Sequence, residues 1–189
     1  MPTKIQGGLG KDKVQDGTVG LSDCDTELYG KIAALTTINL GEAKTASGTV
    51  VDFDVPEGVK RVTVMFDGVS TNGSSLPLVR LGDGLISETD YLSVANQVGT
   101  SSNPKLDTSG FLLNYENQAT RGVSGYITIV SDGDNTWHES GNMFLLNSAA
   151  VCLSAGTKSL SGTLDRIRIT TVNGTDTFDS GTINISWEF

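Results

Sequence analysis

The chain has 189 residues, the length of one domain with a short additional segment. Its 22 Asp and Glu residues outnumber its 13 Lys and Arg residues, so the net charge is −9 at neutral pH. Because Lys and Arg supply most of the affinity for nucleic acid and for anionic lipid, this balance argues against both partners. No apolar run approaches the roughly 18 residues of a transmembrane helix, so we expect no membrane insertion.

The most frequent residues are typical of β structure. The chain contains 23 Gly, 22 Thr and 19 Ser residues. Thr favours strands, whereas Gly and Ser are common in turns. The composition therefore predicts an all-β chain with many turns.

Residues 1–44 are predicted to form an extended N-terminal arm ahead of a β domain. Five glycines interrupt residues 1–20, and the apolar residues there are too far apart to build a core. In residues 23–35, apolar side chains recur near a helical spacing, which predicts a short helix.

The arm is predicted to bind another chain. Ordering residues 1–20 costs on the order of 20–40 kcal/mol, more than burial of the arm's own apolar side chains returns. The arm is slightly basic, unlike the acidic chain as a whole, which favours an acidic docking surface. The expected contact residues are four apolar and three basic side chains: Ile5, Leu9, Val14, Val19, Lys4, Lys11 and Lys13.

Residues 45–189 are predicted to form an antiparallel, jelly-roll-like sandwich. Apolar and polar side chains alternate in several runs, as in strands with one buried face. Turn sequences such as Pro56-Glu57-Gly58 and Asn173-Gly174 separate the runs, and we expect eight to ten strands. The positions expected to face the core are Val51, Phe53, Val55, Val62, Val64, Phe66, Ile127, Ile129, Ile167, Ile169, Ile183, Ile185 and Trp187.

Some strands carry apolar side chains on both faces. Met65 and Val130 lie at positions that the alternation places outside the core, and Met-Phe-Leu-Leu at 143–146 has no polar position. Two explanations remain open. Either a loop or the second sheet covers these side chains, or they are buried in an interface between subunits.

The single histidine, His138, has no partner in the sequence that would make it catalytic. Neighbouring strand residues point to opposite faces, so His138 and Glu139 do not form a pair. Ser140 shares a face with His138, but no nucleophile motif surrounds it. We expect an ordinary exposed strand histidine and no enzymatic activity.

Acidic residues in or beside turns are the other candidates for chemistry. Glycoside cleavage needs two carboxylates across a cleft, and no spacing in the sequence places two there. Asp132-Gly133-Asp134-Asn135 resembles part of a calcium loop but lacks the remaining ligands, so a hairpin turn is favoured. The carboxylates weighed are Asp83, Glu88, Asp90, Asp132, Asp134, Asp176 and Asp179.

Aromatic and sulfur residues add no cofactor chemistry. Trp137 is either a core residue or a platform for a sugar ring, and the core is favoured. Cys24 and Cys152 are expected to be reduced, mostly buried thiols without metal-ligand spacing. The sequence predicts no cofactor and no metal site.

Two segments carry a family resemblance. Residues 47–73 read SGTVVDFDVPEGVKRVTVMFDGVSTNG, and residues 158–185 read KSLSGTLDRIRITTVNGTDTFDSGTINI. Both are similar to a small domain of tailed-phage and prophage structural proteins, especially tail-fibre and appendage proteins. The resemblance covers roughly residues 45–189 and transfers no catalytic residue.

The resemblance implies a non-enzymatic virion protein, a homotrimeric tail fibre or tail appendage that contacts other virion proteins through the arm. It implies a place on the phage particle and a possible contact with host surface carbohydrate. A capsid cement or decoration protein is an alternative, in which the arm would link neighbouring shell subunits. A carbohydrate-binding or depolymerising β protein is an alternative of another class.

Overall fold

Antiparallel strands make up the regular structure of the computed structural model, which describes residues 38–98, 104–119, 121–148 and 150–189. The predicted helix at 23–35, the seven expected contact residues of the arm and Cys24 lie outside the described residues. No helix able to span a membrane occurs in the part of the chain that the structure describes.

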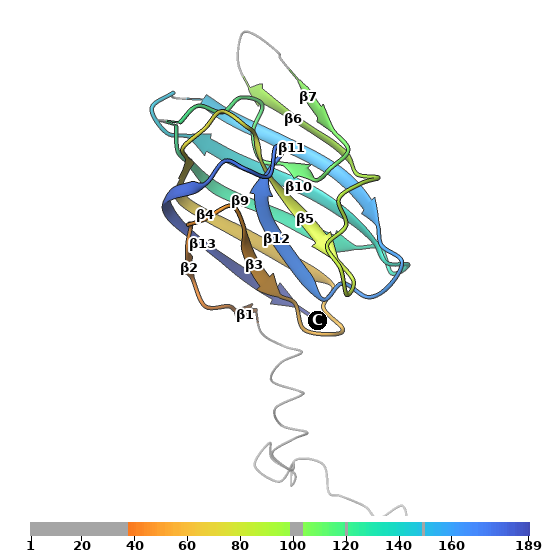
Figure 1. Ribbon diagram of the computed structural model, residues 1–189. Helices are drawn as coiled ribbons and strands as arrows, with labels where there is room; N and C mark the ends of the chain where they lie inside the picture. The colour runs from red at the N-terminus through yellow and green to blue at the C-terminus, as the bar shows by residue number, and fades with distance from the viewer. Residues whose placement is uncertain (1–37, 99–103, 120, 149) are drawn as a thin grey trace, which may run out of the picture. The chain divides into compact units, whose positions relative to one another are not determined.

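Nine of the thirteen strands among the described residues form a large sheet (Figure 1). Its order is β1 (Asn39–Leu40), β13 (Phe178–Glu188), β4 (Arg61–Thr71), β9 (Val123–Ser131), β10 (Thr136–Leu145), β11 (Ala150–Ser159), β6 (Leu92–Val98) and β7 (Lys105–Asp107). β2 (Lys44–Thr45) also pairs with β13, so Asn39, Leu40 and Lys44, which were predicted to belong to the arm, are part of the sheet.

The small sheet packs over one face of the large sheet, as Figure 1 shows. It contains β3 (Val51–Asp54), β12 (Arg166–Thr171), β5 (Pro77–Gly82) and β8 (Phe111–Leu112), in that order. The prediction of an all-β antiparallel sandwich is confirmed. The strands outnumber the eight to ten expected because β1, β2, β7 and β8 have two or three residues each, too few for an alternation pattern.

The core lies between the sheets and is built from the predicted alternation. The core positions that the sequence indicated in β3, β4, β9, β12 and β13 are buried, apart from Trp187, which is half-buried and packs against the core. Tyr91 and Phe111 meet edge to face with ring centroids 5.1 Å apart. The Tyr91 hydroxyl accepts a hydrogen bond from the Leu81 amide at 2.7 Å, which joins the segment before β6 to β5.

β8 extends the small sheet beyond β5, so that the small sheet covers more of the large sheet. Phe111, Leu112 and Leu113 have no exposed surface, and β8 contacts β6, β7 and β11 of the large sheet. Leu112 packs with Leu78 and Ala95 in a second small apolar cluster. The inner face of the large sheet is therefore covered as far as its β6 side, while its outer face has no second sheet among the described strands.

Candidate functional site

The outer face of the large sheet carries exposed large apolar side chains over β9, β10, β11, β6 and β7. Phe144 on β10 lies opposite Val151 on β11, and Val151 lies opposite Val98 on β6, so the side chains form a row across three strands. Because opposed residues of antiparallel strands point to the same side, the row is continuous. We call this surface the apolar face: Leu92, Val98, Leu106, Tyr126, Phe144, Val151 and Leu153.

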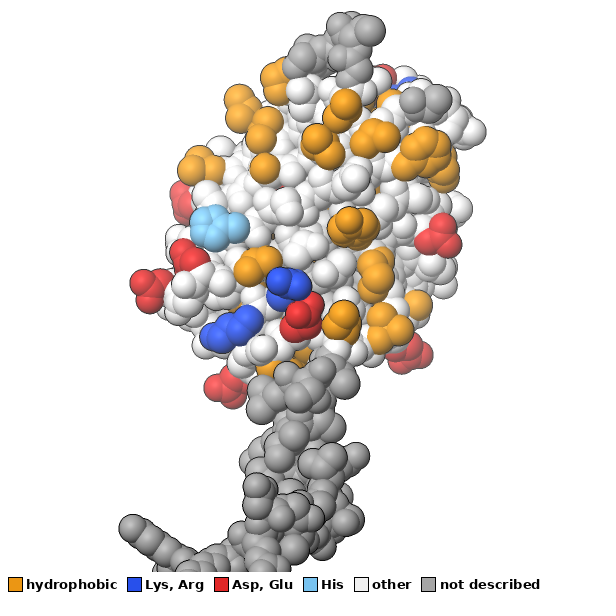
Figure 2. Space-filling view, turned by 180° about the vertical axis from the view of Figure 1, so that it is seen from behind, with side chains coloured by type: hydrophobic (Ala, Val, Ile, Leu, Met, Phe, Trp, Pro, Cys, Tyr) orange, Lys and Arg blue, Asp and Glu red, His pale blue; other side chains and the backbone are white. Residues whose placement is uncertain are grey.

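A shallow hollow lies at the β6–β7 side of the apolar face. Its volume is about 410 Å³, and Leu92, Val94, Leu106 and Ala155 line it. Leu106 is 83% exposed although it is a leucine on a strand. Figure 2 shows hydrophobic side chains most densely over the upper half of this view and scattered over the lower half, where most of the charged side chains lie.

The outer face of the small sheet has the opposite chemistry. Arg168 donates two hydrogen bonds to the Asp52 carboxylate at 2.8 and 2.7 Å. Arg80 donates to Glu88 at 2.7 Å, and the Arg80 side chain is 11% exposed. Charged pairs therefore lie on the outer side of the small sheet, whereas the β9–β7 part of the large sheet's outer face is mainly apolar. The β4–β13 part of that same face carries the exposed Arg61–Glu188 ion pair at 3.2 Å.

Of the apolar residues that the alternation placed outside the core or left without a polar face, some are buried in the structure and others are exposed. Met143 and Leu145 are buried in the core, whereas Phe144 between them is 46% exposed on the outer face. Val130 is also exposed, and Met65 is half-buried beside Tyr126. No described strand or loop removes Phe144 and Val130 from water, so among the described residues the first explanation, cover within the chain, fails for them.

His138 lies where the sequence placed it, on the exposed face of β10. Its Nε2 is 3.4 Å from Oδ2 of Asp132, and the imidazole is 57% exposed. Ser140 is exposed on the same face, and Glu139 is buried on the other. The structure brings no nucleophile and base together here within the described residues.

Glu139 is a buried carboxyl that sequence reasoning did not single out. Ser154 on β11 donates a hydrogen bond to its Oε1 at 2.6 Å, and Oε2 has no partner among the described residues. Burial raises the pKa of Glu139 to about 7, against the lowering effect of the Ser154 hydrogen bond. With 4% of its surface exposed, this carboxyl is sealed from a substrate.

Most of the turn carboxylates accept hydrogen bonds from backbone or side-chain donors, some in their own turn and some in a neighbouring loop or strand. Asp83 accepts from Ser161 and Gly162, both at 2.6 Å, and these bonds lower its pKa. The Asp132 carboxylate accepts from the Asp134 amide at 3.2 Å, which is a hairpin-turn contact. Three or more potential metal ligands do not gather anywhere in the described part of the chain.

Trp137 and Cys152 are core residues. Trp137 is 3% exposed, so its ring has no free face on which a sugar could stack. Cys152 is fully buried, and burial raises the pKa of its thiol. The prediction of a buried thiol is confirmed for Cys152.

Comparisons with family models, with curated proteins and with solved structures found no match to this chain. The resemblance to phage appendage domains therefore stays a prediction from two sequence segments.

Proposed function

We propose that this chain is a non-enzymatic structural protein of a phage particle, a tail fibre or tail appendage that assembles as a homotrimer through its apolar face. The observation that carries the proposal is the group of exposed large apolar side chains on the outer face of the large sheet. A domain that left this group of Leu, Val, Phe and Tyr side chains in water would be prone to association.

The composition of the apolar face supports a subunit interface. Its side chains are large and uncharged, and Tyr126 adds a hydroxyl that can remain hydrated at the rim. Interface cores are depleted of charge and enriched in aromatic residues. The trimer, the particle and the arm as anchor come from the resemblance and the arm's composition.

Sedimentation of the full chain at micromolar concentration tests the assembly. We expect a species of three times the 19.8 kDa chain mass. A monomer at that concentration would overturn the proposal that the apolar face is a stable self-association surface.

Location on the particle is tested separately by antibody-gold labelling of particles from a strain that encodes the chain. Few labels at the tail are expected for a fibre or appendage, whereas hundreds over the shell would replace this role with capsid cement. In the same particles, a chain without residues 1–20 should remain folded but fail to incorporate. Incorporation at normal copy number would contradict the anchor role of the arm.

A further inference from the structure

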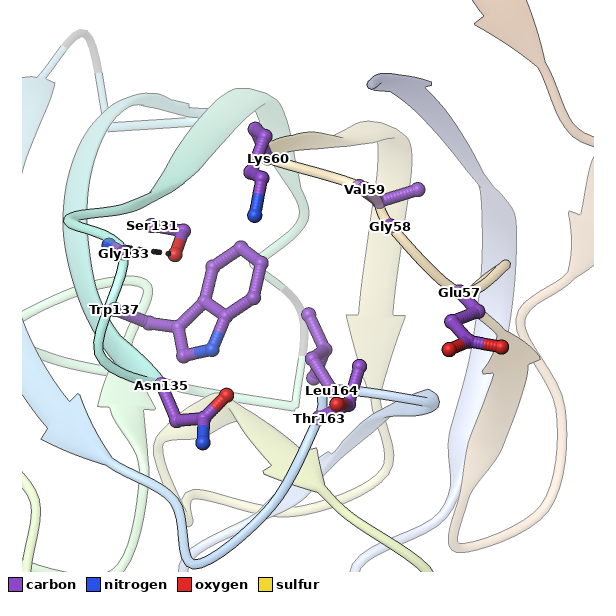
Figure 3. Close-up of a pocket in the computed structure, with 10 residues that line it drawn as sticks. All are labelled: Glu57, Gly58, Val59, Lys60, Ser131, Gly133, Asn135, Trp137, Thr163 and Leu164. Carbon is purple, nitrogen blue, oxygen red and sulfur yellow. Dashed lines mark hydrogen bonds between the residues drawn. The ribbon is translucent and has the colours of Figure 1, made fainter.

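Strands β4 and β12 each connect a loop at one end of the sandwich to a loop at the other end. The loops before these strands and the β9–β10 turn surround a pocket of about 170 Å³, and the Trp137 ring forms part of its wall (Figure 3). The indole nitrogen of Trp137 is buried, so a ligand in this pocket does not reach it. The loops after β4 and β12 contain the two Asn-Gly pairs of the chain, Asn72-Gly73 and Asn173-Gly174.

The fold requires glycine at the second position of both pairs. A Cβ on Gly73 would overlap the Asp176 carboxylate. Gly174 has a φ of 68°, a left-handed conformation that glycine adopts without steric cost. Glycine also leaves its own backbone nitrogen unhindered, so this nitrogen is well placed to attack the side-chain amide of the preceding asparagine. The structure therefore retains two dipeptides that are chemically susceptible.

Hydrogen bonds hold the Asn173-Gly174 pair on every side. Oδ1 of Asn173 accepts from the Thr171 hydroxyl at 2.8 Å and from the Thr175 and Asp176 amides at 3.0 and 3.1 Å. Its Nδ2 donates to the Asp176 carboxylate at 2.7 Å, and the Gly174 amide donates to the Thr171 carbonyl at 2.9 Å. Bringing the Gly174 nitrogen onto Cγ of Asn173 would disturb all five bonds, so this pair is protected.

The Asn72-Gly73 pair is held by a single side-chain bond. Oδ1 of Asn72 accepts from the Thr177 amide at 2.9 Å. Neither Nδ2 of Asn72 nor the Gly73 amide has an acceptor within the described part of the chain, and the Asn72 side chain is exposed to water. The bond from Thr177 does not oppose attack at Cγ, because a donor on Oδ1 stabilises the negative charge that develops there.

We propose that Asn72 is a site of spontaneous self-modification, in which the neighbouring backbone converts its amide to a carboxylate. The Gly73 nitrogen bonds to Cγ of Asn72, the Cγ–Nδ2 bond breaks, and Nδ2 leaves as ammonia with the proton that Gly73 gives up. Water, the only co-reactant, then opens the five-membered succinimide ring at either carbonyl. The product carries aspartate or isoaspartate at position 72.

The modification changes both charge and backbone at the end of the β4–β13 pair. Each event adds one negative charge to a chain that is already acidic. Isoaspartate also lengthens the backbone by one carbon atom at the residue whose amide donates to the Thr177 carbonyl at 2.9 Å. The inference does not depend on the proposed function, since it concerns the isolated chain in water.

Peptide mass spectrometry of the unmodified full chain tests the inference. The chain is incubated at neutral pH for days, in its folded state and in denaturant, and each sample is then digested with trypsin. Peptide 62–80 contains Asn72 as its only asparagine, and fragmentation of peptide 169–189 isolates Asn173. In the folded chain we expect Asn72 to gain the mass of an amide-to-acid change at least about tenfold faster than Asn173, because far fewer hydrogen bonds restrain it.

The denatured sample supplies the reference rates. There the two asparagines should convert at similar rates, since the sequence around each offers the same unhindered glycine. Equal rates in the folded chain, or conversion of Asn72 only in denaturant, would overturn the inference.

Two variants assign the chemistry to its groups. Thr171→Val removes one donor to Asn173 with little change of shape, and we expect Asn173 to convert roughly threefold to tenfold faster while Asn72 is unchanged. Asn72→Gln lengthens the side chain, so attack by Gly73 would need a six-membered ring, and the mass gain in peptide 62–80 should disappear. A gain that persists in Asn72→Gln, or an unchanged Asn173 rate in Thr171→Val, would contradict the proposal.

Discussion

Ser154 on β11 donates its hydroxyl proton to Oε1 of Glu139 on β10 across 2.6 Å, inside the sandwich. The hydrogen bond favours the carboxylate, but burial of the group outweighs it and raises the pKa to about 7. The ordinary value for this carboxyl is 4.5. The folded chain therefore retains a proton on Glu139 over a pH range in which the unfolded chain has lost it.

This difference makes stability depend on pH. Between about pH 4.5 and pH 7 the folded state binds more protons than the unfolded state, so the free energy of unfolding falls as the pH rises. Above the folded-state pKa, Glu139 is ionised in both states, and its contribution to the free energy of unfolding no longer changes with pH. The total loss is about 3 kcal/mol, since one pKa unit corresponds to about 1.4 kcal/mol.

Glu139→Gln should remove this dependence. The amide keeps the shape of the side chain and an oxygen for Ser154, but it carries no charge. We expect the variant to exceed the unmodified chain by about 1–3 kcal/mol in denaturant unfolding at pH 8 and to match it near pH 4.5. The exposed Glu42→Gln is the control, and an equal gain there would show that the effect is not specific to the buried carboxyl.

The centre of the apolar face offers a direct test of self-association. Leu153→Glu places a charge on an exposed site that is 48% accessible, so the free energy of unfolding should change by about 0.5 kcal/mol or less. Association should weaken at least about tenfold because a desolvated charge opposes the interface. Sedimentation over a range of concentrations measures the shift.

Thr182→Glu is the matched variant for this experiment. Thr182 is exposed on the outer face of β13, away from the strands that carry the apolar face. Its association should equal that of the unmodified chain. A similar loss in both variants would point to a general effect of added negative charge.

Much of the fold could be predicted from local alternation. The runs in β4, β9 and β13 have one apolar face each, and that pattern predicts which side chains face the core. The register shifts between β4 and β13 and between β4 and β9 could not be predicted from it. β5 could not be identified in this way, because all six of its residues are buried and Arg80 interrupts its apolar run. The Arg80 side chain is satisfied by Ser109 and Glu88, which lie outside its own strand.

The candidate sites were harder to predict than the strands. Leu106 and Leu153 are ordinary strand residues in the sequence, and their common face depends on the pairing of β6 with both β7 and β11. The alternation predicted that Glu139 and His138 point to opposite faces of the sheet. It did not predict that the Glu139 carboxyl is buried in the core. The pocket beside Trp137 depends on three loops that are distant in the sequence.

Two glycines of the β9–β10 hairpin allow two costs of an added Cβ to be compared. At Gly133 the cost is backbone strain alone, and at Gly125 it is strain together with a steric clash. Gly125 has a φ of 143°, and a Cβ there would lie 2.2 Å from the Asn142 carbonyl oxygen. Gly133 has a φ of 110° with open space around it. Gly125→Ala should cost about 3 kcal/mol or more in thermal or denaturant unfolding, and Gly133→Ala about 1 kcal/mol. Equal costs would show that the sheet yields at β10.

The thiol of Cys152 should be inert in the folded chain. Burial raises its pKa, so the reactive thiolate is scarce at neutral pH. In a Cys24→Ala background, a thiol reagent should label Cys152 only as fast as the chain unfolds and should label it at once in denaturant. Rapid labelling under native conditions would contradict the burial of this side chain.

The two strands nearest the C-terminus occupy interior positions in both sheets. β12 lies between β3 and β5, and β13 separates β4 from the short strands β1 and β2. During synthesis, neither sheet can close until residues from Arg166 onward have left the ribosome. A chain that ended before Arg166 would expose unpaired strand edges in both sheets and present a target for proteolysis and aggregation.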